Sequence, residues 1–273
     1  MCAFRDLGKQ IFLFRAVAVT LVVTLLMGSI ITALAAAGDL DTTFGITSSG
    51  VNYTDINGAG ATDRIFALAL QTDDKIIAAG VSESNFTVAR YETDGLLDIT
   101  FGAPNGYVTT AINTTSVAYG AAVQTDGKIV VVGSSNDGVR DYFTVARYDT
   151  NGTLDTAGFN APTGYIVSTL SAATDVATSV VLQADGKIVV AGYANKRFAV
   201  ARYHPNGTLD TAGFNAPNGY RVFPIGGQSD QAQAVGLQSN GKIILAGHAD
   251  NGKSDDFAVA RITTAGALDT TFN

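Results

Sequence analysis

The sequence has little of the chemistry on which most enzymes and metal proteins depend. Its only cysteine is Cys2, so everything beyond the N-terminus has neither a thiol nor a disulfide. The two histidines, His204 and His248, are 44 residues apart and have no cysteine near them, which argues against zinc. Glutamate occurs only as Glu83 and Glu92, which disfavours a glycosidase built on paired glutamates. These absences favour a binding protein over an enzyme, and no cofactor is expected because no phosphate loop or dinucleotide fingerprint is present.

Negative charge prevails over positive charge. The formal net charge is −7, with 24 acidic and 17 basic residues. An acidic surface disfavours nucleic acid and anionic membranes as partners. We therefore expect no nucleic-acid partner.

Residues 1–37 have the pattern of a secretory signal peptide. Arg5, Lys9 and Arg15 precede the uncharged run Ala16–Ala37, which ends in small residues. An uncleaved membrane anchor is the alternative, because 22 uncharged residues suffice to cross a bilayer. In either case residues 38–273 are expected to form one exported domain, secreted or at the cell surface. It would contact the membrane only through the N-terminal segment, if that segment stays attached.

The rest of the sequence consists of four repeats. A Phe-x-Val-Ala-Arg-Tyr motif recurs at spacings of 57, 55 and 59 residues, the last copy ending in Ile: 86–91, 143–148, 198–203 and 257–262. A Gln-x-Asp-Gly-Lys turn precedes it at 124–128 and 183–187, with variants at 71–75 and 238–242. A Leu-Asp-x-x-Phe segment follows it, and another copy stands at 40–44. Such a period indicates a unit that buries its apolar face only against its neighbours.

Each repeat predicts about four short strands and no helix. Asp-Gly between two apolar runs is a strong hairpin signal. The run Ile129–Val132 is continuously apolar, which is typical of a strand buried on both faces. The sequence therefore predicts an all-β fold, a β-propeller of four four-stranded blades with a repeat of about 57 residues. A β-solenoid is the second interpretation, but its coils are usually shorter.

Together, the three motifs resemble the delta-60 repeat family. The resemblance covers residues 39–273 and rests on the turn, the Phe-x-Val-Ala-Arg-Tyr strand and the Leu-Asp-x-x-Phe segment in fixed order. It implies a β-propeller in a bacterial secreted or surface protein, and it implies no particular activity. Asp74 in place of Gly and Ile262 in place of Tyr depart from the pattern in the terminal repeats.

An arginine and an aspartate eight residues later recur in every repeat. We expect each pair to stabilise a partly buried corner, through a bidentate contact or a turn cap, because a residue present in every unit most often has a structural task. The pairs are Arg90 and Asp98, Arg147 and Asp155, Arg202 and Asp210, and Arg261 and Asp269.

One turn resembles a Ca²⁺ loop. Asp149, Asn151 and Asp155 place oxygen atoms at intervals around a Gly, which suits a hard cation. The twelve-residue loop with its final Glu is absent, however, and an Asx turn explains the same residues. Ca²⁺ binding is therefore the weaker interpretation.

Two connections break the symmetry of the repeat and are candidates for binding, because binding residues concentrate on loops of a rigid scaffold. Both are longer than their counterparts in the first and third repeats. Their candidate residues are Asn136, Asp137, Arg140, Asp141 and Tyr142, and His248, Asp250, Asn251, Lys253, Asp255 and Asp256.

Three functions fit these observations. The first is an exported, non-enzymatic scaffold that binds a protein or glycan through loops on one propeller face. The second is an extracellular propeller enzyme, a hydrolase or lyase, that acts on a polymer. The third is a structural surface protein that assembles rings or arrays. The protein is expected to be a monomer or a homodimer, and two chains could build an eight-bladed ring.

Overall fold

The computed structural model describes residues 39–45, 49–58, 60–227 and 229–272, and in these residues it contains only strands, turns and connections. No helix in this part of the chain is long and apolar enough to cross a membrane. The predicted signal segment, residues 1–37, lies outside the described residues. The fifteen strands are β1 (Asp63–Leu70), β2 (Ile76–Ser82), β3 (Asn85–Tyr91), β4 (Tyr107–Thr110), β5 (Thr115–Val123), β6 (Ile129–Asn136), β7 (Asp141–Tyr148), β8 (Tyr165–Ser168), β9 (Asp175–Leu182), β10 (Ile188–Ala194), β11 (Arg197–Tyr203), β12 (Tyr220–Phe223), β13 (Asp230–Leu237), β14 (Ile243–Asp250) and β15 (Asp255–Ile262).

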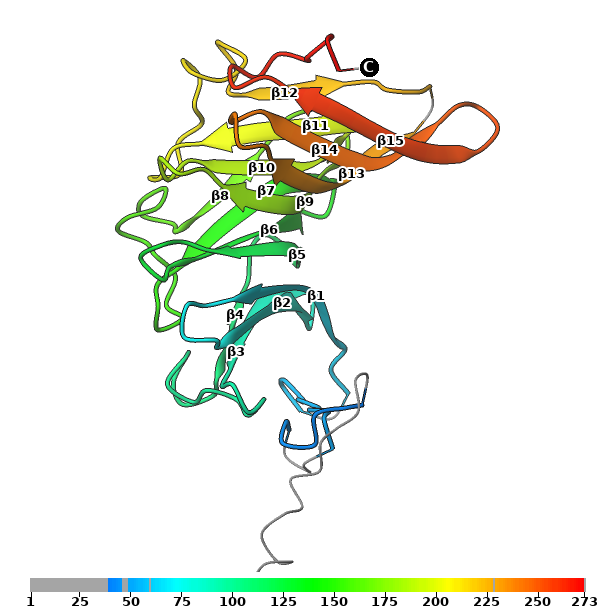
Figure 1. Cartoon of the computed structure of the whole chain (residues 1–273). Helices are drawn as coiled ribbons and strands as arrows, with labels where there is room; N and C mark the ends of the chain where they lie inside the picture. The colour runs from blue at the N-terminus through cyan, green and yellow to red at the C-terminus, as the bar shows by residue number, and fades with distance from the viewer. Residues whose placement is uncertain (1–38, 46–48, 59, 228, 273) are drawn as a thin grey trace, which may run out of the picture.

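The strands form four antiparallel sheets, one for each repeat. Blade 1 is β1–β4, blade 2 is β5–β8, blade 3 is β9–β12 and blade 4 is β13–β15, each with its strands in sequence order. The blades lie one above another, with blade 1 at one end of the molecule and blade 4 at the other (Figure 1). The predicted all-β propeller is confirmed. Blade 4 has three strands in the described residues where the others have four.

The hairpin turns have the predicted geometry. In blade 2 the N–H of Gln124 donates to the carbonyl of Lys128 at 2.8 Å, and the N–H of Gly127 donates back to Gln124 at 2.9 Å. Gly127 has a φ of 82°, which glycine adopts without strain. Asp74 has a φ of 62° at the equivalent place in blade 1, so the same turn forms there without a glycine.

The core consists of layers between successive blades. Alternate residues of each middle strand face opposite neighbours. In blade 2, Val131 packs in the layer shared with blade 1, whereas Val130 and Val132 pack in the layer shared with blade 3. A third layer joins blades 3 and 4. A blade buries both of its faces only when it has a neighbour on each side.

Arg147 and Asp155 meet in a buried corner of blade 2. Arg147 Nε donates to Asp155 Oδ2 at 2.8 Å, and Nη2 lies 2.7 Å from the same oxygen. The other oxygen, Oδ1, accepts the N–H of Gly158 at 2.8 Å. The guanidinium lies over the Phe159 ring, 4.8 Å from its centroid. The contact is therefore not the expected two-oxygen fork, because the turn backbone occupies one carboxylate oxygen.

The same arginine also joins its blade to the next one. Arg90 Nη1 donates to the carbonyl of Thr150 in blade 2 at 2.6 Å. Arg202 Nη1 donates to the carbonyl of Thr264 in blade 4 at 2.8 Å. In blade 4, Arg261 Nε pairs with its own aspartate at 2.7 Å, and no described residue accepts a bond from its Nη1. The repeated arginine thus tightens each corner and also holds two blades together.

A lysine from the hairpin turn completes the corner. Lys128 Nζ donates to Asp155 Oδ2 at 2.8 Å. Burial opposes the ionisation of Asp155, but hydrogen bonds from Lys128, a turn N–H and Arg147 outweigh it and hold the pKa of this carboxyl below its ordinary value. The pKa values of Asp98 and Asp210 are lowered by the same balance of burial against hydrogen bonds and nearby cations.

We expect Asp155→Ala to lower the free energy of unfolding by about 3 kcal/mol, because it leaves the buried Arg147 guanidinium without its counter-charge. Chemical denaturation measures this change. The control is Asp185→Ala, which removes a surface ion pair to Lys187 and should cost less than about 1 kcal/mol. Equal losses in the two variants would contradict a structural role for the corner.

Stability should fall in acid because of these corners. A carboxyl whose pKa is lower in the folded than in the unfolded chain stabilises the fold above its unfolded pKa of about 4, and this contribution is lost as the pH falls further. The melting temperature should therefore drop below about pH 4. Asp155→Asn should show a shallower drop, since one such group is gone. Parallel curves for the variant and the natural chain would contradict the assignment.

Candidate functional site

The two ends of the blades differ in what they contain. The turn end contains the hairpin turns and the Arg–Asp corners, which are alike in every blade. The loop end contains the connections between the second and third strands and the links from blade to blade. These segments bond to each other there: the N–H of Thr114 donates to Asn136, and the N–H of Gly227 donates to Asp250, at 2.8 and 2.7 Å. The predicted binding loops both lie at this end.

The first predicted loop, in blade 2, is held by its own side chains. Asp137 Oδ1 accepts the N–H groups of Val139 and Arg140 at 2.9 and 3.1 Å, and Tyr142 donates its hydroxyl to Asp137 Oδ2 at 2.7 Å. Asn136 Nδ2 donates to Asp141 Oδ1 at 3.0 Å. The loop is therefore ordered by these bonds without a ligand.

Arg140 reaches from this loop to the link between blades 2 and 3. Its Nη1 donates to the carbonyl of Ser171 at 2.9 Å, and its Nη2 lies 3.3 Å from Thr169 Oγ1. The guanidinium also stacks on the Tyr142 ring at 4.6 Å. Arg140 thus holds its loop against the link between two blades, and its charge is partly satisfied by these contacts.

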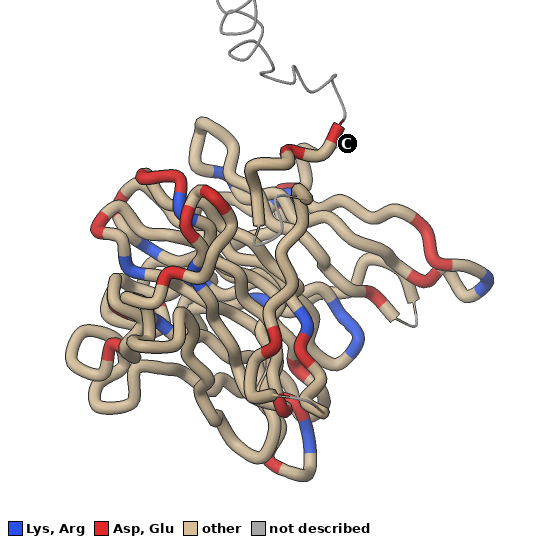
Figure 2. The backbone as a smooth tube through the Cα atoms, turned by 90° about the horizontal axis from the view of Figure 1, so that it is seen from below, with Lys and Arg blue, Asp and Glu red and all other residues tan. Residues whose placement is uncertain are grey.

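The second predicted loop joins β14 to β15. Asn251 Oδ1 accepts the N–H groups of Lys253 and Ser254 at 2.9 and 3.1 Å, and Asn251 Nδ2 bonds Asp256. The hairpin projects from the body of the molecule and carries charges of both signs (Figure 2). With Lys196 and Ser229 of the neighbouring segments it borders a shallow hollow of 590 Å³.

The structure does not bring the two predicted loops into one site. They belong to blades 2 and 4, which have blade 3 between them. His248 lies within β14, opposite Phe257 on β15 and Gln231 on β13, and not in the loop. The candidates therefore divide into two separate regions of the loop end.

The residues of the proposed Ca²⁺ loop already have partners. Asp149 and Asp155 both bond Lys128 Nζ at 2.8 Å. Asn151 Oδ1 accepts the N–H and hydroxyl of Thr153 at 3.0 and 2.8 Å, which is an Asx turn. No group of three or more His, Cys, Asp or Glu residues in the described part of the chain could hold a metal ion.

A different site lies along the innermost strands, at the axis around which the blades are arranged. The first strand of each blade has a β-bulge at the same place, where its register against the second strand shifts by one residue. A bulge redirects a side chain that would otherwise follow the alternation of the strand. The bulged residues are Phe66, Tyr119, Thr178 and Gln233, and all four border one hollow of 440 Å³.

The lining of this axial hollow is neutral. Val176, Tyr193 and Gln231 complete it, so its side chains are aromatic, aliphatic, hydroxyl and amide. The rings of Phe66 and Tyr119 lie 5.3 Å apart at an angle of 57°. Burial raises the pKa of Tyr119 and Tyr193, and the charge of nearby Asp141 adds to it. Both phenols stay protonated at neutral pH and can donate hydrogen bonds.

Reasoning from the sequence missed this hollow, although a signal for it is present. Each bulged residue stands ten residues before the isoleucine that opens the second strand of its blade: Ile76, Ile129, Ile188 and Ile243. The positions directly before and after it are small or aliphatic in all four repeats, whereas this one changes from Phe to Tyr, Thr and Gln. Such a variable position within a constant frame points to function more directly than loop length does.

Several solved structures are similar to this chain at low identity. They include a protein of unknown function from Bacteroides caccae, with a TM-score of 0.37 and 13% identity over 77% of this chain and 81% of that one. A putative oxidoreductase (glucose dehydrogenase) from Thermus thermophilus has a TM-score of 0.47 and 15% identity over 74% of this chain and 62% of that one. A gluconolactonase from Xanthomonas campestris has a TM-score of 0.31 and 12% identity over 74% and 73%.

A search of curated proteins found no match. One family model matches, described as a domain of unknown function (DUF5122) β-propeller. Its four matches cover residues 71–101, 124–157, 183–212 and 238–272. Each match runs from a hairpin turn through the Phe-x-Val-Ala-Arg strand to the Leu-Asp pair of the corner, and the first and last matches also include the corner phenylalanine. These are the parts of the blade that the structure keeps constant. The chain is a β-propeller repeat protein.

Proposed function

We propose that this protein is an exported, non-enzymatic binding scaffold, a delta-60 type propeller whose axial hollow takes a neutral glycan. The observation that carries the proposal is the bulge repeated in all four innermost strands. It points one side chain from each blade toward the same space, and these side chains differ from blade to blade. The frame is shared by all blades, whereas the lining residue differs between them.

The chemistry of the lining suits a sugar. Aromatic rings such as Phe66 and Tyr119 offer apolar faces for the C–H groups of a pyranose, and their edges fix its orientation. The amides of Gln231 and Gln233 can donate to or accept from sugar hydroxyls. The hydroxyl of Thr178 donates to the carbonyl of Ala232 at 2.8 Å and can still accept a hydrogen bond from a sugar. A volume of 440 Å³ is within the range of small-molecule sites and fits a short saccharide.

The same lining argues for binding without catalysis. Proton transfer to a leaving group needs a carboxyl, imidazole or similar group within hydrogen-bond reach. None of the described residues that border the hollow carries a carboxyl, imidazole or amino group. Asp141 lies close enough to affect both tyrosines but is not itself in the lining. The alternative, an enzyme that acts on a polymer, would need a catalytic acid from elsewhere.

The experiment is calorimetry or thermal denaturation with a panel of neutral oligosaccharides. A ligand at 100 times its Kd stabilises the fold by about 2.7 kcal/mol, which is readily measured. We expect one class of saccharide to bind. Tyr119→Ala and Gln233→Ala should each weaken binding about tenfold or more, which corresponds to about 1.4 kcal/mol.

The control is Lys253→Ala, in the exposed β14–β15 loop outside the hollow. It should leave the affinity unchanged. If Lys253→Ala weakens binding and Tyr119→Ala does not, the loops and not the hollow form the site. If no saccharide binds the natural chain, the proposed function is wrong.

A further inference from the structure

The described N-terminal residues repeat the outer part of a blade. Gly45 donates its N–H to the carbonyl of Asp94 at 2.7 Å, as Gly102 does to Asn151 at 2.8 Å one blade later. The Phe44 ring packs on Gly95, which has no side chain to exclude it, as Phe101 packs on Gly152. Residues 40–45 therefore sit on blade 1 as the corner of blade 1 sits on blade 2.

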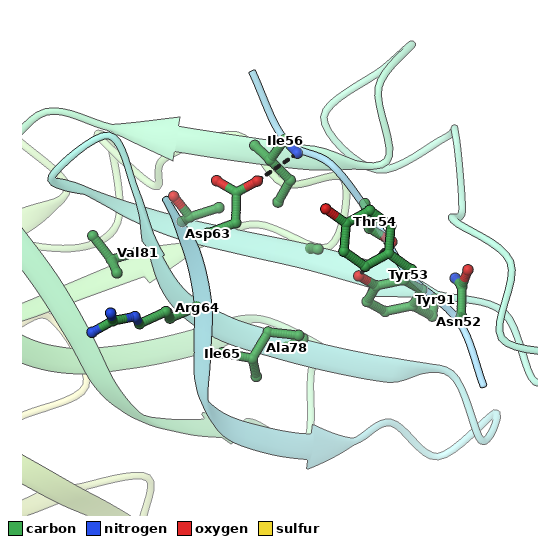
Figure 3. Close-up of a pocket in the computed structure, with 13 residues that line it drawn as sticks. Asn52, Tyr53, Thr54, Ile56, Asp63, Arg64, Ile65, Ala78, Val81 and Tyr91 are labelled. Carbon is green, nitrogen blue, oxygen red and sulfur yellow. Dashed lines mark hydrogen bonds between the residues drawn. The ribbon is translucent and has the colours of Figure 1, made fainter. Parts of the chain in front are cut away.

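The following residues, 50–56, correspond to a fourth strand. Tyr91 donates its hydroxyl to Thr54 Oγ1 at 3.0 Å, and Tyr148 donates in the same way to Thr110 of β4 at 2.8 Å. Figure 3 shows Tyr53 and Thr54 of this segment next to Tyr91, with the N–H of Ile56 bonded to Asp63. Yet residues 50–56 pair with no strand in the described part of the chain. A fourth strand is present without the other three strands of its sheet.

The described part of blade 4, at the opposite end of the molecule, has no such fourth strand. The third strands of blades 1, 2 and 3 pair with β4, β8 and β12, whereas β15 has no outer strand partner in the described residues and bonds there only to its own corner, at Leu268 and Asp269. Phe257 on β15 is fully exposed, and its equivalents Phe86, Phe143 and Phe198 are fully buried. Blade 4 therefore presents both an open edge and an apolar face.

The outer face of blade 1 is also apolar and resembles the face that each later blade packs against the blade before it. Ile65, Leu68 and Leu70 of β1 are more than half exposed. Ala118 of β5 and Ala177 of β9 occupy the position of Ile65 and are fully buried against the preceding blade. The two ends of the molecule thus carry the two halves of an inter-blade layer that occurs three times inside it.

We propose that a second copy of this chain fills these places, with its blade 4 docked on blade 1 of the first. Residues 51–54 of one copy become the fourth strand of blade 4 in the other. The register follows from the pairing of β3 with β4, where Phe86 faces Thr110 and Thr87 faces Thr109. Equivalent positions put Phe257 opposite Thr54, and Ala258 opposite Tyr53. Two such contacts between two chains close an eight-bladed ring.

A sequence identity between the two ends supports a second copy as the occupant. The pentapeptide Leu-Asp-Thr-Thr-Phe occurs at residues 40–44 and again at 268–272. Blade 1 already holds the first copy of it beside Gly95. Blade 4 of another molecule carries the same pentapeptide at residues 268–272. When the chains dock, either this copy or residues 40–44 of the first molecule occupies the position beside Gly95. Arg261, whose Nη1 is free of described partners, would then meet the carbonyl of Thr93, as Arg90 meets Thr150.

The alternative occupant of the β15 edge is the segment of residues 50–56 of the same chain. Figure 1 places that segment and blade 1 at one end of the molecule and β15 at the other. The three layers between them are filled by fully buried side chains, which resist a change of angle. Closure by a second copy leaves these layers as they are, whereas closure within one chain has to repack them.

Cysteine cross-linking separates the two cases. In a chain with Cys2→Ser, Tyr53→Cys and Ala258→Cys are made singly, mixed after purification and oxidised. Residues directly opposite on antiparallel strands are close enough for a disulfide. We expect a disulfide-linked dimer in the mixture and not in either single variant under the same oxidation. A monomeric internal cross-link in the double variant, with none in the mixture, would overturn the proposal, as would the absence of any cross-link.

Complementation tests the same contact without a new bond. Phe257→Asp places a charge in the apolar outer face of blade 4, and Leu68→Asp does the same in that of blade 1. Both side chains are exposed in the single chain, so each variant should fold. Light scattering should find the natural chain dimeric and each variant unable to form a closed ring of two. A one-to-one mixture should recover a dimer, because one intact pair of faces remains. A monomeric natural chain, or variants as dimeric as the natural chain, would refute the inference.

Discussion

Every sheet of this protein is apolar on both faces, and the rest of the structure depends on that constraint. Residues such as Val130 and Val131 are adjacent in one strand and are fully buried against different neighbours. A blade therefore reaches its full stability only between two others, and no blade is an independent unit. The constraint accounts for the near-uniform repeat, and it also leaves the two terminal faces unsatisfied in a single chain.

The Arg–Asp corner fixes each blade internally and links it to the next blade, which makes the scaffold rigid. Arg147 pairs with Asp155 within its blade and bonds the carbonyl of Pro205 in the next one. Because the same corner recurs at the turn end of each blade, that end has little freedom to vary. Variation is concentrated at the loop end and at the bulges of the innermost strands. Stability and recognition thus occupy different parts of one blade.

Much of the fold could be predicted from the sequence, because a repeated motif implies a repeated environment. The hairpin turn at Gly127 and the pairing partners Arg147 and Asp155 follow from spacing and residue type. The axial hollow could not be predicted from strand alternation, because a single bulge turns Phe66 and Tyr119 away from the face that alternation gives them. The free edge of β15 could not be predicted from its strand motif either. Its sequence resembles that of β3, β7 and β11, and a strand motif reads the same whether or not its neighbour is present.

Hydrogen exchange on residues 50–56 and 255–262 tests most directly whether the faces of every blade are covered in solution. In the single chain residues 50–56 and the outer edge of β15 lack a strand partner, while the inner edge of β15 pairs with β14, and unpaired amides exchange quickly. The account predicts that the outward amides of β15 exchange as slowly as those of β3, β7 and β11, and that residues 51–54 are protected with them. Rapid exchange in both segments at concentrations where the chain is fully folded would show that the ends stay open, and would contradict the account.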